Sequence, residues 1–300
     1  MGLSSLTAAL AIASYQLALL ARAGALDPAS AAVGLALPLA LIAALLCVAW
    51  PRLAGIVFPT RALAGGLAVS LVAFPVFAWA FGQDGVRELM EKTFAVAAQG
   101  MGLEETVSAE LLAGVSAVLK RSFGAILFLF LFASAWGGTS IGRRWRFMRA
   151  ARQVMADRAD AADNPEEFAR LTVALSSLGV DEAGLAPSLP VYGVPRSFVW
   201  LLLASWAGIL VSRFVPAGAF EAVAWNVAIS VSICYGVQGL AVAGAFIGRI
   251  GMAPAGRILG ALFIVFVLVG GTVGLAAGAL MALLGTLETW IPLRMIRQGE

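Results

Sequence analysis

Long apolar runs separated by short polar breaks are the dominant pattern of this chain. A run of about 20 apolar residues is long enough to cross the hydrocarbon core of a bilayer as an α-helix. Runs of this kind lie at residues 4–22, 31–50, 62–81, 122–142, 198–214, 222–246 and 258–290. The pattern therefore predicts an all-α, polytopic transmembrane helix bundle with seven spans, forming a single integral membrane domain over residues 1–300.

The last run has two unusual features. Residues 258–290 would form about 50 Å of helix, which exceeds what one tilted span needs, so a break near Gly270-Gly271 would give two short helices and eight spans. Small residues also recur there at every fourth position, at Gly270, Gly274, Gly278, Ala282 and Thr286. Such spacing predicts close helix packing in a bilayer, within one chain or as a dimer face, and leaves the oligomeric state open.

Two polar segments interrupt the apolar pattern. Apolar residues at helical spacing on both sides of residues 100–102 predict an amphipathic helical hairpin over residues 83–121. That hairpin would lie on the membrane surface, cap a cavity or bind a partner. Residues 143–196 predict a short helix and an irregular Pro-rich loop, because Asn164 and Pro165 are typical of a helix start and three prolines follow later.

Arginines set the predicted orientation. Five of them, with no acid, lie within ten residues: Arg143, Arg144, Arg146, Arg149 and Arg152. Because cytoplasmic segments are rich in Lys and Arg, residues 143–196 are predicted to be cytoplasmic, with a docking or anionic-lipid site as the alternative role. Alternation of spans then puts the N-terminus in the cytoplasm and residues 83–121 outside. We expect a multi-pass protein of a bacterial inner membrane, surrounded by the lipid bilayer.

Composition disfavours several function classes. Of 300 residues, 61% are hydrophobic and 12% are charged, and the net charge of +3 gives no indication of nucleic-acid binding. The chain has no histidine, and both cysteines, Cys47 and Cys234, lie in apolar runs. It contains no phosphate-binding loop, nucleophile elbow or set of metal ligands. We therefore expect no catalytic residues, no cofactor and no metal.

A polar stripe follows one of the predicted spans. It carries Asn226, Ser230, Cys234 and Gln238 at intervals of four, with Trp225 and Tyr235 beside them. This spacing places the four residues on one slowly turning face of a helix. Since an unpartnered polar group in hydrocarbon costs on the order of 1 to several kcal/mol, the face must meet a ligand, water or another helix. An outward-opening cavity lined by Asn226, Tyr235 and Gln238, with room for a small molecule, would indicate ligand binding, whereas fully bonded amides packed against neighbouring helices would indicate a structural role.

One carboxylate, Glu288, directly follows the small residues of the last run. Arg294 lies beyond Pro292, which disturbs a helix. If the chain bends at this proline, the carboxylate and the guanidinium can form an ion pair.

Four segments, taken in order, resemble the YybS-like family of predicted bacterial membrane proteins. They cover residues 133–144, 194–200, 225–242 and 284–294, with the motif residues Pro195, Trp200, Gly239, Gly285, Glu288, Trp290 and Arg294. In that family Asp is more common at the position of Glu288. The resemblance implies a protein similar to the substrate-capture subunits of energy-coupling-factor transporters, which pass a vitamin to a separate ATP-driven module.

Three functions explain these features. The leading one is small-molecule binding or transport by a subunit without its own ATPase, which would need a membrane transport partner to supply energy. The second is a structural or regulatory membrane scaffold with no ligand. The third, an intramembrane enzyme acting on lipid, would have Glu288 as its acid or base, but the absence of a catalytic set disfavours an enzyme.

Overall fold

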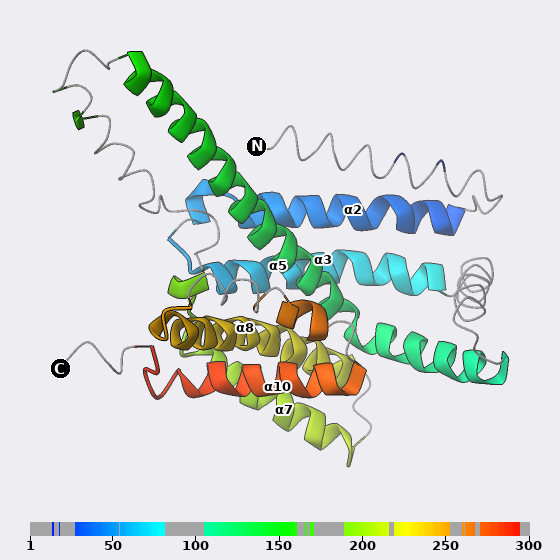
Figure 1. The fold of residues 1–300 in the computed structure, drawn as a ribbon. Coiled ribbons are helices and arrows are strands. Elements are labelled where there is room, and N and C mark those ends of the chain that lie inside the picture. The colour runs from blue at the N-terminus through cyan, green and yellow to red at the C-terminus, as the bar shows by residue number, and fades with distance from the viewer. Residues whose placement is uncertain are drawn as a thin grey trace.

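The computed structural model of the chain is all-helical over the residues that it describes, namely 28–53, 55–81, 105–160, 189–215, 219–252, 262–267 and 271–294, with residues 14, 18, 166, 169, 170 and 260. Its α-helices are α2 (Pro28–Val48), α3 (Phe58–Phe81), α5 (Glu105–Asp160), α7 (Phe198–Ser212), α8 (Ala219–Arg249) and α10 (Gly271–Leu287), and two short 3-10 turns are η1 (Pro51–Leu53) and η2 (Leu189–Val191) (Figure 1). No strand occurs in this part of the chain, so the predicted all-α class is confirmed for it.

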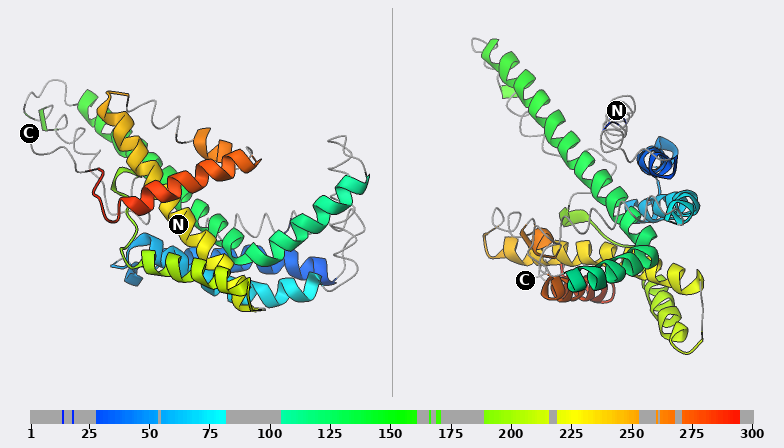
Figure 2. Two further views of the ribbon diagram at one scale, coloured as in Figure 1. Left: turned by 90° about the horizontal axis from the view of Figure 1, so that it is seen from below. Right: turned by 90° about the vertical axis from the view of Figure 1, so that its right-hand side faces the viewer.

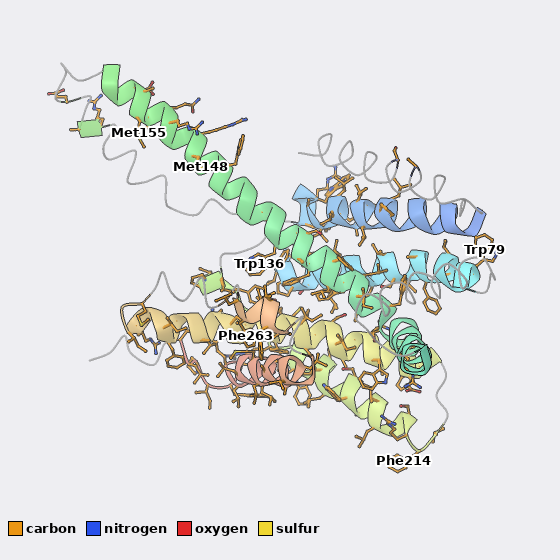
Figure 3. All side chains as sticks on the ribbon, turned by 45° about the vertical axis from the view of Figure 1, so that its right-hand side comes forward. Trp79, Trp136, Met148, Met155, Phe214 and Phe263 are labelled. Carbon is orange, nitrogen blue, oxygen red and sulfur yellow. The ribbon has the colours of Figure 1, made fainter. Side chains whose placement is uncertain are left out.

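Within the described residues, three helical stretches are long and apolar enough to cross a membrane: Phe58–Val76, Arg121–Thr139 and Phe220–Arg249. Shorter apolar helices cover Pro38–Val48, Phe198–Ser212 and Val273–Leu287. Large apolar side chains on several of these helices are exposed, including Leu71, Trp200, Leu210 and Leu283. Phe214, just after α7, is also exposed (Figure 3). This outward apolar surface suits a lipid environment. Apart from residues 14 and 18, the run at residues 4–22 lies outside the described residues, and the count of seven spans stays a prediction.

Helix α5 joins segments that the sequence pattern separates into half of the hairpin, a span and the start of the loop. It runs unbroken for 56 residues, through the second half of the expected outer hairpin, the span and the arginine cluster. The changes in polarity do not end the helix because residues 105–160 contain no proline and an internal glycine costs only about 1 kcal/mol. Residues 143–160 are therefore helix, and residues 82–104, which include the first half of the hairpin, lie outside the described residues.

The last apolar run is folded back on itself. Residues 262–267 are helical, α10 begins at Gly271, and Gly271 has a φ of +58°. A Cβ placed on Gly274 would lie 3.0 Å from the carbonyl oxygen of Val267, and one on Gly278 would lie 3.3 Å from the Val267 side chain. Residues 267 and 274 would be about 10 Å apart along a continuous helix. The predicted break is confirmed, and Gly274 and Gly278 lie close to Val267 on its other side; Gly270 lies outside the described residues.

One end of the bundle gathers segments that are distant in the sequence. The Arg61 side chain donates a hydrogen bond to the Val48 carbonyl at 3.3 Å, and the Trp136 and Tyr192 rings lie 5.0 Å apart. The ring of Phe58, at the start of α3, lies 5.9 Å from the ring of Trp136. Phe58 therefore connects the start of α3, which carries Arg61, to the Trp136–Tyr192 contact. The predicted topology places all these positions on the cytoplasmic side, so the fold is consistent with the predicted alternation of spans.

Candidate functional site

Helices α8 and α10 run in the same direction (Figure 1) and cross where two glycines meet. A Cβ placed on Gly239 would lie 3.2 Å from the backbone nitrogen of Gly285, and one on Gly285 would lie 2.7 Å from the backbone nitrogen of Gly239. Each such Cβ would also overlap a carbonyl oxygen, of Met281 and Tyr235 respectively. The two glycines therefore allow direct backbone contact, and this contact brings the end of α10 against the middle of α8.

The first residue of the polar stripe is inserted into the backbone of α5. The Asn226 Oδ1 accepts a hydrogen bond from the Ala125 N–H at 2.7 Å. Its Nδ2 donates to the Arg121 carbonyl at 2.8 Å and to the Ala222 carbonyl at 2.6 Å. Residues 121 and 125 are the two partners of one helical i to i−4 step, so the amide contacts both groups of that step. Asn226 is fully bonded, which for this residue favours helix packing over ligand binding.

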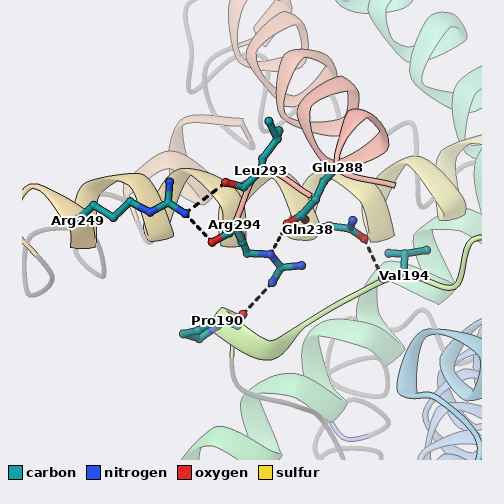
Figure 4. Close-up of polar contacts among 7 residues, drawn as sticks. All are labelled: Pro190, Val194, Gln238, Arg249, Glu288, Leu293 and Arg294. Atoms are coloured by element: carbon teal, nitrogen blue, oxygen red, sulfur yellow. Dashed lines mark hydrogen bonds and ion pairs between the residues drawn. The ribbon is translucent and has the colours of Figure 1, made fainter. Parts of the chain in front are cut away.

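Gln238, at the other end of the stripe, holds the segment that leads into α7. Its Oε1 accepts a hydrogen bond from the Val194 N–H at 2.8 Å, and its side chain is buried (Figure 4). Between the two amides, Ser230 is buried and the buried Cys234 thiol lies beside the Tyr192 hydroxyl. The stripe thus meets α5 at one end and the segment around residue 194 at the other, as expected from a face that turns slowly around the helix.

Glu288 and Arg294 form an ion pair, as the bend at Pro292 predicted. After the last turn of α10, the N–H of Leu293 donates to the Ile291 carbonyl at 2.7 Å, which turns the chain back. The Arg294 Nη1 also donates to the Pro190 carbonyl at 2.8 Å, and Arg249 from the end of α8 donates to the Leu293 carbonyl at 3.3 Å (Figure 4). The Glu288 side chain is only 7% exposed. The pair therefore connects the end of α10 to η2, and Arg249 connects the same segment to the end of α8.

Several buried oxygen atoms near this ion pair have no hydrogen-bond partner among the described residues. They are Glu288 Oε2, Thr289 Oγ1, Tyr235 OH and Tyr192 OH. The Thr289 hydroxyl lies near that of Tyr235, and Tyr235 in turn lies near Cys234 and Tyr192. We call Glu288, Thr289, Tyr235 and Tyr192 the hydroxyl cluster. Both tyrosines are fully buried, so the cluster places one carboxylate oxygen and three hydroxyls in the interior of the bundle.

The remaining predicted site residues have other surroundings. The Trp225 ring packs edge-on against Trp206 at 6.2 Å, between α8 and α7. Pro195 accepts a hydrogen bond from the Phe198 N–H at 3.0 Å at the start of α7. Trp200 and Trp290 are exposed, as expected of tryptophans at a membrane interface.

Sequence reasoning missed two members of the hydroxyl cluster, Tyr192 and Thr289. Tyr192 lies in the Pro-rich link, where no periodic pattern marks a buried residue. Its position between Pro190 and Pro195 is a usable signal, because closely spaced prolines fix the backbone and a single aromatic residue between them can anchor the segment. Thr289 lies next to Glu288 in the segment 284–294, where nothing in the sequence distinguishes it as a buried polar residue.

Comparisons with known proteins found no relative. No family model, no curated protein and no solved structure matches the chain. The resemblance to the YybS-like family therefore stays a prediction that rests on the motif residues alone.

Proposed function

We propose that this chain is a membrane-embedded subunit that binds a small polar molecule at the hydroxyl cluster. The observation that carries the proposal is the group of four buried oxygen atoms without partners: Glu288 Oε2, Thr289 Oγ1, Tyr235 OH and Tyr192 OH. A buried polar group left unsatisfied costs about 1 to 3 kcal/mol, and more when it is charged. The Tyr235 and Thr289 hydroxyls lie close enough to bond to each other, as do the Tyr192 hydroxyl and the Cys234 thiol. Glu288 Oε2 is therefore the atom that most lacks a donor among the described residues, and a ligand that bonds to it would offset the cost.

The chemistry of the cluster restricts the ligand. An ionised carboxylate only accepts hydrogen bonds, whereas Tyr and Thr hydroxyls both donate and accept. Arg294 already neutralises Glu288. The ligand class that fits is a small, uncharged molecule with at least one hydrogen-bond donor for Glu288 Oε2 and acceptors for the hydroxyls, such as an amide-containing or hydroxylated vitamin or a nucleoside.

The chain carries no nucleotide-binding motif of its own. Any energy-dependent uptake would therefore need a separate partner, as the resemblance to substrate-capture subunits implies. In this proposal the chain resides in the bacterial inner membrane with its N-terminus in the cytoplasm, and the cluster lies toward the cytoplasmic side. Binding would then favour the inward-facing state of a transport cycle.

A second candidate, a scaffold without ligand, is favoured by Asn226. This side chain uses its carbonyl and both amide hydrogens to join α8 to α5 and to its own helix. In that reading the polar stripe only holds helices together, because interhelical hydrogen bonds contribute about 1 kcal/mol each in membrane proteins. The two candidates differ in the role of the hydroxyl cluster.

Thermal unfolding of the purified, detergent-solubilised protein against a panel of vitamins and nucleosides separates them. A compound present at about 100 times its Kd stabilises the folded protein by about 2.7 kcal/mol. Thr289→Val and Tyr235→Phe should each remove this stabilisation while changing the free energy of unfolding of the ligand-free protein by only about 1 kcal/mol, since each removes one neutral hydroxyl.

The matched control is Thr286→Val, one turn earlier on α10, whose hydroxyl donates a hydrogen bond to the Ala282 carbonyl at 2.7 Å. It should lower the stability of the ligand-free protein slightly and keep the response to the ligand. If no compound in the panel stabilises the wild-type protein, or if Thr289→Val responds like wild type, the binding proposal fails and the scaffold reading replaces it.

A further inference from the structure

The second half of α5 forms an arm that leaves the bundle. The stretch of α5 that could cross a membrane ends at Thr139, and the helix continues to Asp160. Figure 2 shows this part of α5 running obliquely away from the other helices, and Figure 3 shows Met148 and Met155 on it. We call residues 140–160 the α5 arm.

The α5 arm exposes large apolar residues on one face. Trp145 is 55% exposed, Met148 40% and Met155 57%. Together with the exposed Arg152, they occupy positions i, i+3, i+7 and i+10, which lie on the same side of a helix. A Trp and two Met in contact with water are unfavourable, so this face needs an apolar cover.

Basic residues lie on and beside the same face. The Arg149 guanidinium stacks over the Trp145 ring, 5.3 Å from its centroid, and is itself exposed. All five arginines between residues 143 and 152 belong to this arm, and no acid lies among them. The arm therefore presents apolar side chains next to guanidinium groups, which bind phosphate. This combination suits the boundary between the acyl chains and the headgroups of a membrane.

The position of the arm along α5 indicates what covers its apolar face. Trp145 follows Thr139 by six residues, about 9 Å of helix, and the headgroup layer is about 5 to 7 Å thick on each side of a bilayer. An oblique helix therefore reaches this layer at Trp145. We propose that the α5 arm lies in the cytoplasmic interface of the membrane and binds anionic phospholipid headgroups through Arg149 and Arg152, with Trp145, Met148 and Met155 embedded beside them.

Fluorescence quenching in nanodiscs tests the proposal on the full chain. The signal of Trp145 is the difference between the wild-type protein and Trp145→Phe. Brominated phosphatidylglycerol should quench it more strongly than brominated phosphatidylcholine at the same mole fraction. Because each basic residue near the surface favours anionic lipid by about fivefold, the double variant Arg149→Gln/Arg152→Gln should remove most of this difference.

The matched control is Arg52→Gln/Arg213→Gln, which changes the net charge equally at two exposed positions outside the arm. It should keep the preference for phosphatidylglycerol. High salt should weaken the preference, because headgroup attraction is screened. If both brominated lipids quench Trp145 equally, or if neither quenches it, the arm does not bind anionic headgroups and the proposal is wrong, whatever ligand the hydroxyl cluster binds.

Discussion

The side chain of Asn226 is bonded to the backbone of Ala125, a residue 101 positions earlier in the chain. The contact lies in the part of α5 that meets α8, and the ribbon of α5 changes direction along its course (Figure 1). A side chain inserted between an N–H and the carbonyl four residues before it is a known cause of helix bending. Gly124 permits the close approach, since a Cβ there would lie 3.0 Å from Asn226 Oδ1.

Asn226→Asp should destabilise the protein more than Asn226→Ala. Alanine removes three hydrogen bonds, but the freed Ala125 N–H and Arg121 carbonyl can bond to each other, so the loss should be about 1 kcal/mol. A carboxylate cannot donate to the carbonyls of Arg121 and Ala222 and would face both of them, at a cost of about 3 kcal/mol or more. Equilibrium unfolding in detergent measures both values. Equal losses of unfolding free energy in the two variants would mean that the hydrogen bonds donated by the Asn226 amide contribute nothing to stability.

Alanine at either glycine of the α8–α10 crossing should force the helices apart. Gly239→Ala and Gly285→Ala each introduce a Cβ against the facing backbone, with an expected loss of about 1 to 3 kcal/mol. Gly236→Ala is the matched control on α8, because a Cβ there meets nothing within 4 Å. It should be neutral or stabilise the helix by up to about 1 kcal/mol. Equal effects of all three variants in thermal unfolding would contradict the tight crossing.

The Glu288–Arg294 ion pair should show strong energetic coupling. Each single variant, Glu288→Arg or Arg294→Glu, leaves a charge without its partner at a largely buried position, so a loss of about 3 kcal/mol is expected. The double charge swap should recover at least half of it. Failure of the swap to rescue either single variant would count against the pair.

A second ion pair provides the control. Arg121 and Glu221 lie 3.8 Å apart, with side chains 62% and 27% exposed. Exposed pairs contribute about 0 to 1 kcal/mol. The same double-mutant cycle at Arg121 and Glu221 should therefore give a coupling near the lower end of that range, well below the value for Glu288 and Arg294.

The fold predicts on which side the chain ends. Because Arg249 is bonded to the Leu293 carbonyl, the ends of α8 and α10 lie together. In a variant with Cys47→Ser, cysteines introduced at Met252 and Gly299 should react with an impermeant reagent from the same side of the membrane, and one at Phe214 from the opposite side. An unbroken last span would instead place residue 299 on the side of Phe214.

Periodicity predicted which residues face inward but not what they meet. The spacing of Asn226 and Gln238 identified a polar face, and both side chains do form buried or interhelical bonds. Their partners are backbone groups of residues 125 and 194, which have no side-chain signature in the sequence. No sequence pattern therefore distinguishes a ligand-binding amide from one that bonds to a neighbouring backbone.

Changes of polarity misled the prediction of helix ends. The hairpin and the loop were predicted where α5 becomes polar, but hydrogen bonds along a helix backbone do not depend on hydrophobicity. Gly274 and Gly278 of the small-residue seam do approach Val267 closely, yet the tighter contact is at Gly239 and Gly285, outside that seam. Two isolated glycines on different helices give no periodic signal, so their meeting could only be seen in the fold.

The unbroken course of α5 has a mechanical consequence. Its 56 residues measure roughly 84 Å along the axis, about twice the thickness of a whole bilayer. Asn226 bonds to this helix near one third of its length, and the ribbon changes direction along its course, so α5 consists of two unequal segments joined by a bend. A change in the angle of this bend would move the longer segment, which carries the arginines, relative to the rest of the bundle.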